Sequence, residues 1–304
     1  ILGHARLAHD FNHQALAALV ERGHGGTLSA LVLMSNDAAD WLNFGEVKQA
    51  AAMSQKLSDI LTARGTADAD RVSYLANQGG ILLAFGRHQQ ALAVLDRALA
   101  ASQNSSNLFW RHRAMFFRAQ TLVRLGRKDD AVRALDEVEA AYRADAVKNK
   151  AFLATVALAR AEWQGRHGDA AGGLQLVEQQ MKDLDPGTGP ASPALRRAWP
   201  LAAELALALP QPDVARAATW AEAAVKAGSA ASPDPTRSAH VGQAQLLLAQ
   251  AQWGLGQQGL AQKTLAAALT ALGNGLGDDH DRVAAARAVQ AAWQKPQPAS
   301  AAGR

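Results

Sequence analysis

A single spacing of small residues recurs along the chain and limits the folds that it can adopt. It is clearest between Leu75 and Ala98, where Gly79, Gly86 and Ala91 follow one another at intervals of seven and five residues. Large apolar residues lie between them at helical spacing. This pattern predicts two amphipathic helices that turn at Gly86 and touch through their small residues. Because one such hairpin cannot bury its apolar face alone, the pattern also predicts that several hairpins stack.

The same spacing returns about every 42 residues along the chain. The residues equivalent to Gly86 are Gly45, Gly126, Gly168 and Gly256, and the fifth unit turns at Pro210 to Pro212 instead. We therefore expect an all-α array over residues 27–277, built from six hairpins at 27–64, 68–102, 105–144, 146–184, 193–227 and 236–273. Pro200 is expected to kink the first helix of the fifth hairpin or to mark its start.

Further helices are expected on both sides of the array, as leading and closing caps. The leading cap lies in residues 1–26, and its packed face would carry Leu7, Phe11, Ala15 and Leu19. The closing cap lies in residues 278–293 and would pack through Val283, Ala286, Val289 and Trp293. The stretch DPGTGPASP, residues 185–193, reads as a loop, and residues 294–304 read as a disordered tail.

The spacing of small residues resembles that of the tetratricopeptide repeat. The repeat of about 42 residues is longer than the family's usual 34, which makes the chain similar to the long-helix repeats of kinesin light chains and of bacterial multidomain regulators. The resemblance implies a right-handed α-solenoid. It also implies a protein–protein interaction module that binds a peptide or protein segment in its concave groove, as the regulatory or scaffold part of a larger bacterial protein. A passive structural spacer is the alternative.

Composition excludes several other classes of protein. The chain has no cysteine, so disulfides and thiolate metal sites are ruled out. Its net charge of +4 over 304 residues is a weak field that does not by itself indicate nucleic acid. No run of 18 apolar residues is present, so we expect no membrane insertion.

The chain begins at Ile1 without the pattern of a signal peptide. We expect a fragment of a longer cytoplasmic protein, while a periplasmic location and the oligomeric state stay open.

Two asparagines are candidate contacts to a bound peptide. In the long-helix repeats, an Asn two positions before the small residue of the first helix binds the main chain of an extended peptide. By resemblance, Asn36 and Asn77 have this role here, since they precede Ala38 and Gly79. An Asn amide offers both a donor and an acceptor, which suits recognition of a backbone. Two solvated side chains are the simpler interpretation.

The third hairpin carries a basic face instead. Arg113, Gln120 and Arg124 share one face of its first helix, and Phe117 takes the place of the asparagine. We expect this face to bind a carboxylate or phosphate group, so that the partner would have acidic character. A solvated basic face is the competing interpretation. The chain is not similar to the chaperone-tail receptors, because only Asn77 and Arg113 match their five-residue carboxylate clamp.

Other chemistries are weaker candidates. Phe109, Trp110 and Phe116 flank the basic residues and could stack on RNA bases, although core packing explains them more simply. The stretch LAHDFNH, residues 7–13, resembles the phosphoacceptor box of histidine kinases. By this resemblance His9 would take the phosphate group and Asp10 would orient it. However, no nucleotide-binding segment follows in the sequence. His9 and His13 are also spaced like a pair of metal ligands, without an evident third ligand. We therefore expect no enzyme activity, no metal and no cofactor.

Overall fold

The structure is a computed structural model, and it describes residues 2–103, 107–144, 149–184 and 191–294. In these residues it contains fourteen α-helices, two short 3-10 helices and no strands. The expected tail over residues 294–304 lies outside the described residues except for Gln294, and so does most of the expected loop over residues 185–193. None of the described helices combines the length and the apolar character that crossing a bilayer requires.

The elements follow one another along the chain as α1 (Leu2–Glu21), α2 (Leu28–Phe44), α3 (Val47–Ala63), η1 (Asp68–Arg71), α4 (Val72–Ala84), α5 (His88–Ala101), α6 (Leu108–Arg124), α7 (Lys128–Arg143), α8 (Lys150–Arg166), α9 (Ala170–Leu184), α10 (Pro193–Leu207), α11 (Val214–Ala231), η2 (Pro235–Arg237), α12 (Ala239–Gly254), α13 (Gln258–Leu276) and α14 (Asp281–Gln294). From α2 to α13 they pack as six consecutive pairs, and neighbouring pairs contact one another. The all-α solenoid of stacked hairpins is confirmed.

Five of the six hairpins turn in the same way. The glycines at their hinges, Gly45, Gly86, Gly126, Gly168 and Gly256, all have positive φ, between 69° and 92°. Each is followed by a residue whose N–H donates to a carbonyl five positions earlier, as Arg87 does to Leu82. This is the Schellman ending of a helix, which favours glycine because a Cβ would clash in the left-handed conformation. The hinge glycines predicted from the spacing are thus confirmed.

Small residues let the two helices of a hairpin approach closely. A Cβ added to Gly79 of α4 would lie 2.4 Å from the Leu95 side chain of α5. A Cβ on Gly173 of α9 would lie 2.7 Å from the Ala161 carbonyl oxygen of α8. These distances are far shorter than a van der Waals contact, so the size of these residues sets the distance between the helices.

The caps pack as helices, but α1 uses a different face from the one predicted. Leu7 and Phe11 are exposed, at 65% and 73%, while His9 and Leu16 face α2 and are buried. At the other end, Val283 and Ala286 of α14 are buried as expected. The prediction is wrong for Leu7 and Phe11, because a buried carboxylate on α2, described below, draws the histidine face inward. Ala15 and Leu19 are partly buried, and Leu19 packs against the apolar cluster of Leu16.

Pro200 neither starts nor ends a helix. α10 begins at Pro193, where the Ser192 hydroxyl accepts a hydrogen bond from the Leu195 N–H at 3.1 Å, and it continues through Pro200. The start at Pro193 suits proline, which lacks the N–H that the first turn would leave unpaired.

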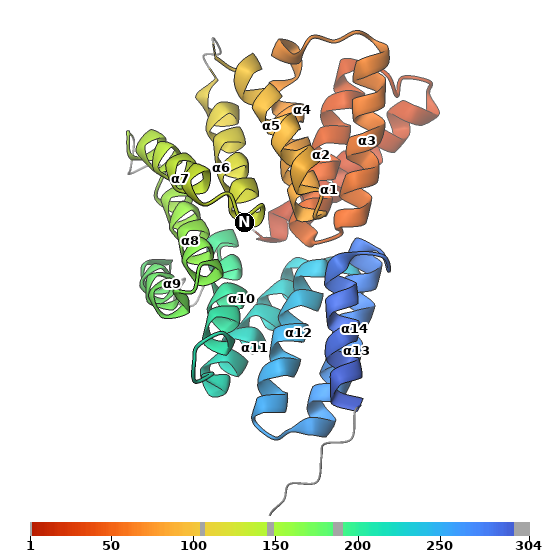
Figure 1. Cartoon of the computed structure of the whole chain (residues 1–304). Coiled ribbons are helices and arrows are strands. Elements are labelled where there is room, and N and C mark those ends of the chain that lie inside the picture. The colour runs from red at the N-terminus through yellow and green to blue at the C-terminus, as the bar shows by residue number, and fades with distance from the viewer. Residues whose placement is uncertain (1, 104–106, 145–148, 185–190, 295–304) are drawn as a thin grey trace, which may run out of the picture.

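The array curves until its two ends meet (Figure 1). The helices follow an arc from α1–α3 through α6–α10 to α12–α14, which lie below α2 and α3 in the view of Figure 1. At the junction, Ala239 N–H donates to the Gly45 carbonyl at 2.9 Å, and the buried Ser238 hydroxyl donates to the Phe44 carbonyl at 2.7 Å. The turn between α2 and α3 is therefore bonded to the start of α12.

Charged and apolar contacts extend this junction. The Arg237 Nε lies 3.1 Å from the buried Glu46 carboxylate. Val47 belongs to the same apolar cluster as Leu246, Leu272 and other residues of α12–α14. The His280 ring meets the Phe85 ring edge to face, with centroids 5.8 Å apart. Turns of the first two hairpins thus pack against the last three α-helices.

Substitution of Gly45 tests the junction, with Gly126 as the matched control. Alanine at either position costs about 1–2 kcal/mol because φ is positive. At Gly45 alone, the new Cβ would also lie 2.5 Å from the Ser238 hydroxyl oxygen, whereas at Gly126 it meets nothing within 4 Å. We expect Gly45→Ala to lose more stability than Gly126→Ala in urea unfolding, and to increase the radius of gyration in small-angle X-ray scattering. Equal effects of the two substitutions would contradict the closed junction.

Candidate functional site

The inner side of the arc carries a row of polar side chains. On α6, Arg113 and Gln120 are seven residues apart and lie on one face, with Arg124 a turn further; all three are partly exposed. On α10, Arg197 and Glu204 have the same spacing and are exposed. The remainder of α6 packs into the apolar core through Phe116, Leu122 and their neighbours. The row therefore lies on the part of α6 and α10 that is open to solvent.

Aromatic rings hold Arg113 in place. Its guanidinium carbon lies 5.0 Å from the centroid of the Phe117 ring and 5.9 Å from that of Trp110. Phe117 itself is 7% exposed and fits against Gly80 of α4, where a Cβ would lie 2.7 Å from the ring. Phe117 thus supports Arg113 by a cation–π contact and is not itself offered to a ligand.

Arg124 has a partner within the protein. Its Nε lies 2.8 Å from the Glu162 carboxylate of α8, and the Nε of Arg166 lies 2.9 Å from the same oxygen. One carboxylate therefore serves two guanidinium groups. Arg113 makes no ion pair with any described residue, and its Nε is buried without a hydrogen-bond partner.

More basic side chains reach this region from the later helices. Arg196 and Arg197 come from α10, His240 from the start of α12 and Arg282 from the start of α14. Burial and the neighbouring charge of Arg197 lower the pKa of Arg113. Burial and the charge of Arg124 lower the pKa of Arg282 to about 10, while Glu162 and Glu204 act in the opposite sense. Side chains from both halves of the arc thus influence one another.

His240 experiences this field most strongly. The mass of protein around the inner side, together with the charges of Arg197, Arg282 and Arg196, lowers its pKa to about 4, although the side chain itself keeps contact with solvent. The histidine is therefore neutral at pH 7 and adds a hydrogen-bonding imidazole, not a charge, to the inner side of the arc.

The two predicted asparagines lie in different environments. Asn36 is exposed on α2. Asn77 is 8% exposed, and its amide nitrogen donates to the Ser35 hydroxyl at 3.2 Å, which ties α4 to α2. The structure therefore brings Arg113, Gln120 and Arg124 together on α6 but leaves Asn77 within the packing between helices.

The histidines of the first helix form a separate cluster. The Asp37 carboxylate of α2 is fully buried, and its two oxygens lie 3.2 Å from Nδ1 of His9 and Nδ1 of His13. The His9 ring also meets the Trp41 and Phe44 rings edge to face. His9 is 4% exposed, and its Nδ1 faces the buried Asp37 carboxylate. This placement favours a structural role that docks α1 on α2.

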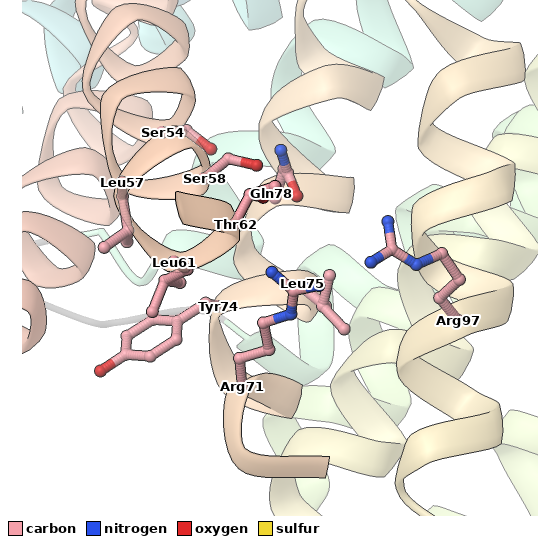
Figure 2. A pocket seen from close by; sticks show the side chains of 10 residues that line it. All are labelled: Ser54, Leu57, Ser58, Leu61, Thr62, Arg71, Tyr74, Leu75, Gln78 and Arg97. Atoms are coloured by element: carbon pink, nitrogen blue, oxygen red, sulfur yellow. The ribbon is translucent and has the colours of Figure 1, made fainter. Parts of the chain in front are cut away.

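Neither of two hollows in the described part of the chain has the character of an enclosed ligand pocket. The cavity drawn in Figure 2 lies among α3, α4 and α5, and its volume of about 40 Å³ holds only a few water molecules. A larger and open hollow of about 290 Å³ lies beside α1, between His13, Trp41 and Pro233. No group of three or more His, Asp or Glu side chains in the described residues is placed to hold a metal ion.

The sequence alone did not indicate that Arg196, Arg197 and Arg282 belong to the same region as the basic face of α6. Arg196 and Arg197 precede Pro200 in the least regular repeat, and Arg282 begins the helix that reads as a cap. The electrostatic interactions of Arg197 with Arg113 and of Arg282 with Arg124 join residues far apart in the sequence. The pair of adjacent arginines near the start of α10 was the only local signal.

Comparison with known proteins supports the fold. No protein-family model matches the sequence, and no curated protein is significantly similar to it. A solved tetratricopeptide repeat protein from Parabacteroides merdae ATCC 43184 is similar in structure, with a TM-score of 0.55 and 11% identity over 94% of this chain and 99% of that chain. BtubC (BKLC) from P. vanneervenii has a TM-score of 0.49 and 15% identity over 86% of this chain and 96% of that chain. The chain has the fold of tetratricopeptide repeat proteins.

His240 predicts a dependence of stability on pH. Its pKa is about 4 in the folded chain and about 6.5 when unfolded, so the unfolded state binds more protons between these values. The stability that this group contributes is complete above about pH 6.5 and is lost as the pH falls towards 4. We expect His240→Gln to weaken the acid dependence of the urea midpoint over this range. The control is His24, which is exposed as His240 is but lies in the turn after α1, and an equal change in His24→Gln would contradict the assignment.

The cluster around Asp37 predicts how α1 is held. Asp37→Ala removes the hydrogen bond between the carboxylate and Nδ1 of His13 and the ion pair with His9, which costs about 1–3 kcal/mol, so α1 should detach more often. Hydrogen exchange at the amides of α1 should become faster. Asp40→Ala is the matched control, because Asp40 lies 3.9 Å from His9 and is partly exposed. If both variants leave exchange in α1 unchanged, the buried carboxylate does not hold the helix.

Proposed function

We propose that the chain is a protein–protein interaction module that binds an extended, acidic segment of a partner on the inner side of the helical array. The fold supports the general class, since stacked helical hairpins provide long concave binding surfaces. The acidic character of the partner is supported by one observation, the row of Arg113, Gln120 and Arg124 on the face of α6 that is not packed in the core.

The three residues would make different contributions. Arg113 has no ion partner among the described residues and lies on two aromatic rings, so its guanidinium group is oriented before a ligand arrives. Gln120 offers a donor and an acceptor to a main chain. Arg124 already binds Glu162, so it would contribute by exchanging or sharing that partner. Asn36 remains a proposed contact further along the array.

The wider setting is part of the proposal. By resemblance of its repeat length to the long-helix type, the module serves as the regulatory or scaffold part of a larger bacterial protein in the cytoplasm. A passive spacer would have the same fold but would not depend on the charge of its inner side.

A peptide-binding experiment tests the proposal. A fluorescent polyglutamate peptide should bind the wild type, as measured by anisotropy, and should bind more weakly as salt is raised. Arg113→Gln combined with Gln120→Ala should reduce the affinity about tenfold or more, since hydrogen bonds to charged groups contribute about 1.5–3 kcal/mol. Arg133→Gln on the outer helix α7, where the side chain is 69% exposed, is the control.

Two outcomes would count against the proposal. Equal binding by the wild type and the double variant would place the binding surface elsewhere. Absence of binding by the wild type at low salt would leave the spacer as the better interpretation. Circular dichroism of both variants checks that they are folded.

A further inference from the structure

Two phenylalanines lie on the surface of the third and fourth hairpins, outside the apolar core. Phe109 in the first turn of α6 is 48% exposed, and Phe152 in the first turn of α8 is 36% exposed. Neither belongs to the core cluster around α6 and α7, whereas Tyr142 is part of it and Trp110 packs against it. Large apolar side chains that gather on a surface mark sites of interaction with other molecules.

Ring contacts join the two phenylalanines into one patch. The centroids of the Phe109 and Phe152 rings are 6.3 Å apart, and the ring planes meet at 70°. Phe152 stacks on Tyr142 of α7 at 5.1 Å, and Phe109 meets the Trp110 ring edge to face at 4.9 Å. Phe109 and Phe152 thus form an exposed aromatic patch across α6, α7 and α8, which are neighbours in the array (Figure 1).

The aromatic patch is continuous with the candidate site on α6. The Trp110 ring that contacts Phe109 also lies 5.9 Å from the guanidinium carbon of Arg113. Arg113 belongs to the row of side chains on which the proposed function depends. One short segment of a partner can therefore contact Phe109 and Arg113 together.

The charges next to the aromatic patch have one sign. The sequence contains no Asp or Glu from residue 97 to residue 128, or from residue 150 to residue 161. Arg111 and Arg113 follow Phe109 in the first half of α6, and neither makes an ion pair with a described residue. Lys150 is exposed in the first turn of α8.

The later arginines of α6 are paired within the protein. The Nε of Arg118 lies 2.6 Å from the Asp96 carboxylate, and the Nε of Arg124 lies 2.8 Å from that of Glu162. The unpaired positive charge of α6 is therefore concentrated beside the aromatic patch. This charge favours a partner that carries carboxylates close to an apolar side chain.

We propose that the aromatic patch binds one large apolar side chain of the partner segment, while carboxylates beside it in that segment bind Arg111 and Arg113. The inference rests on the proposed function, since Arg113 serves both, and it adds an apolar anchor to the acidic segment. Two rings that meet at an angle provide a corner in which such a side chain leaves water. Guanidinium groups bind carboxylates through paired N–H donors.

A second copy of the chain and a nucleic acid fit the patch less well. A two-fold dimer through the patch would bring the same cations of both copies together. A nucleic acid binds through many phosphate contacts, but only Arg111, Arg113 and Lys150 offer unpaired charge here. One face of the Phe152 ring is also covered by Tyr142 and cannot stack on a base.

Two fluorescent peptides of equal length and charge test the anchor. One is polyglutamate with a central leucine, and the other has serine in that place. On the full chain, anisotropy should show that the leucine peptide binds the wild type about tenfold more tightly, because a buried leucine side chain contributes at least that factor. Equal affinities for the two peptides would overturn the proposal.

Phe109→Ser combined with Phe152→Ser locates the anchor site. This variant should lose the preference for leucine and keep the affinity of the wild type for the serine peptide. Should it fail to fold, Phe109→Ser alone should weaken the preference. The matched control is Leu255→Ser with Leu260→Ser, which removes two leucines that are 41% and 50% exposed in the last hairpin and should leave the preference intact. A preference that survives in the folded phenylalanine variants would overturn the proposal.

The serine peptide separates this inference from the proposed function. If it binds and the leucine peptide binds no better, the anchor alone is wrong. If only the leucine peptide binds, and binds Arg113→Gln equally well, the aromatic patch is supported while the acidic row on α6 is wrong. Binding of oligouridylate, or self-association in sedimentation, that is lost in Phe109→Ser would assign the patch to RNA or to a second copy and overturn the proposal.

Discussion

The close approach of Gly45 to Ser238 and Ala239 is the contact on which the shape of the molecule depends. Two hydrogen bonds join the turn after α2 to the start of α12, between residues 194 positions apart in the chain. A side chain at position 45 would occupy the same space as the Ser238 hydroxyl. The absence of a Cβ therefore allows both the hinge of the first hairpin and the meeting of the two ends.

Closure changes the chemistry of the inner side. In an open solenoid, side chains on consecutive inner helices would face bulk water and affect one another little. Here Arg113 of α6 and Arg197 of α10 act on one another electrostatically, and so do Arg124 of α6 and Arg282 of α14. Basic side chains from distant repeats therefore influence one another, which the net charge of +4 over the chain does not reveal.

Much of the fold could be predicted from the sequence, because the constraints that produce it are local. A hinge such as Gly86 needs a left-handed residue, and a contact such as that of Gly79 with Leu95 needs a small one. The face of α1 could not be predicted in this way. Its periodicity favours burial of Leu7 and Phe11, but burial of Asp37 on α2 demands partners for its carboxylate, and His9 and His13 provide them.

The sequence by itself determined the repeating hairpin, and it placed Arg113, Gln120 and Arg124 on one face of a helix. Each of these features follows from the spacing of residues within a single hairpin. Only the tertiary structure decided which side chains meet. It turned Asn77 towards Ser35, placed Phe117 beneath Arg113 and brought the charge of Arg282 to act on His240. The reason is cumulative geometry: each hairpin adds a small rotation, and only their sum determines that the last helices contact the first.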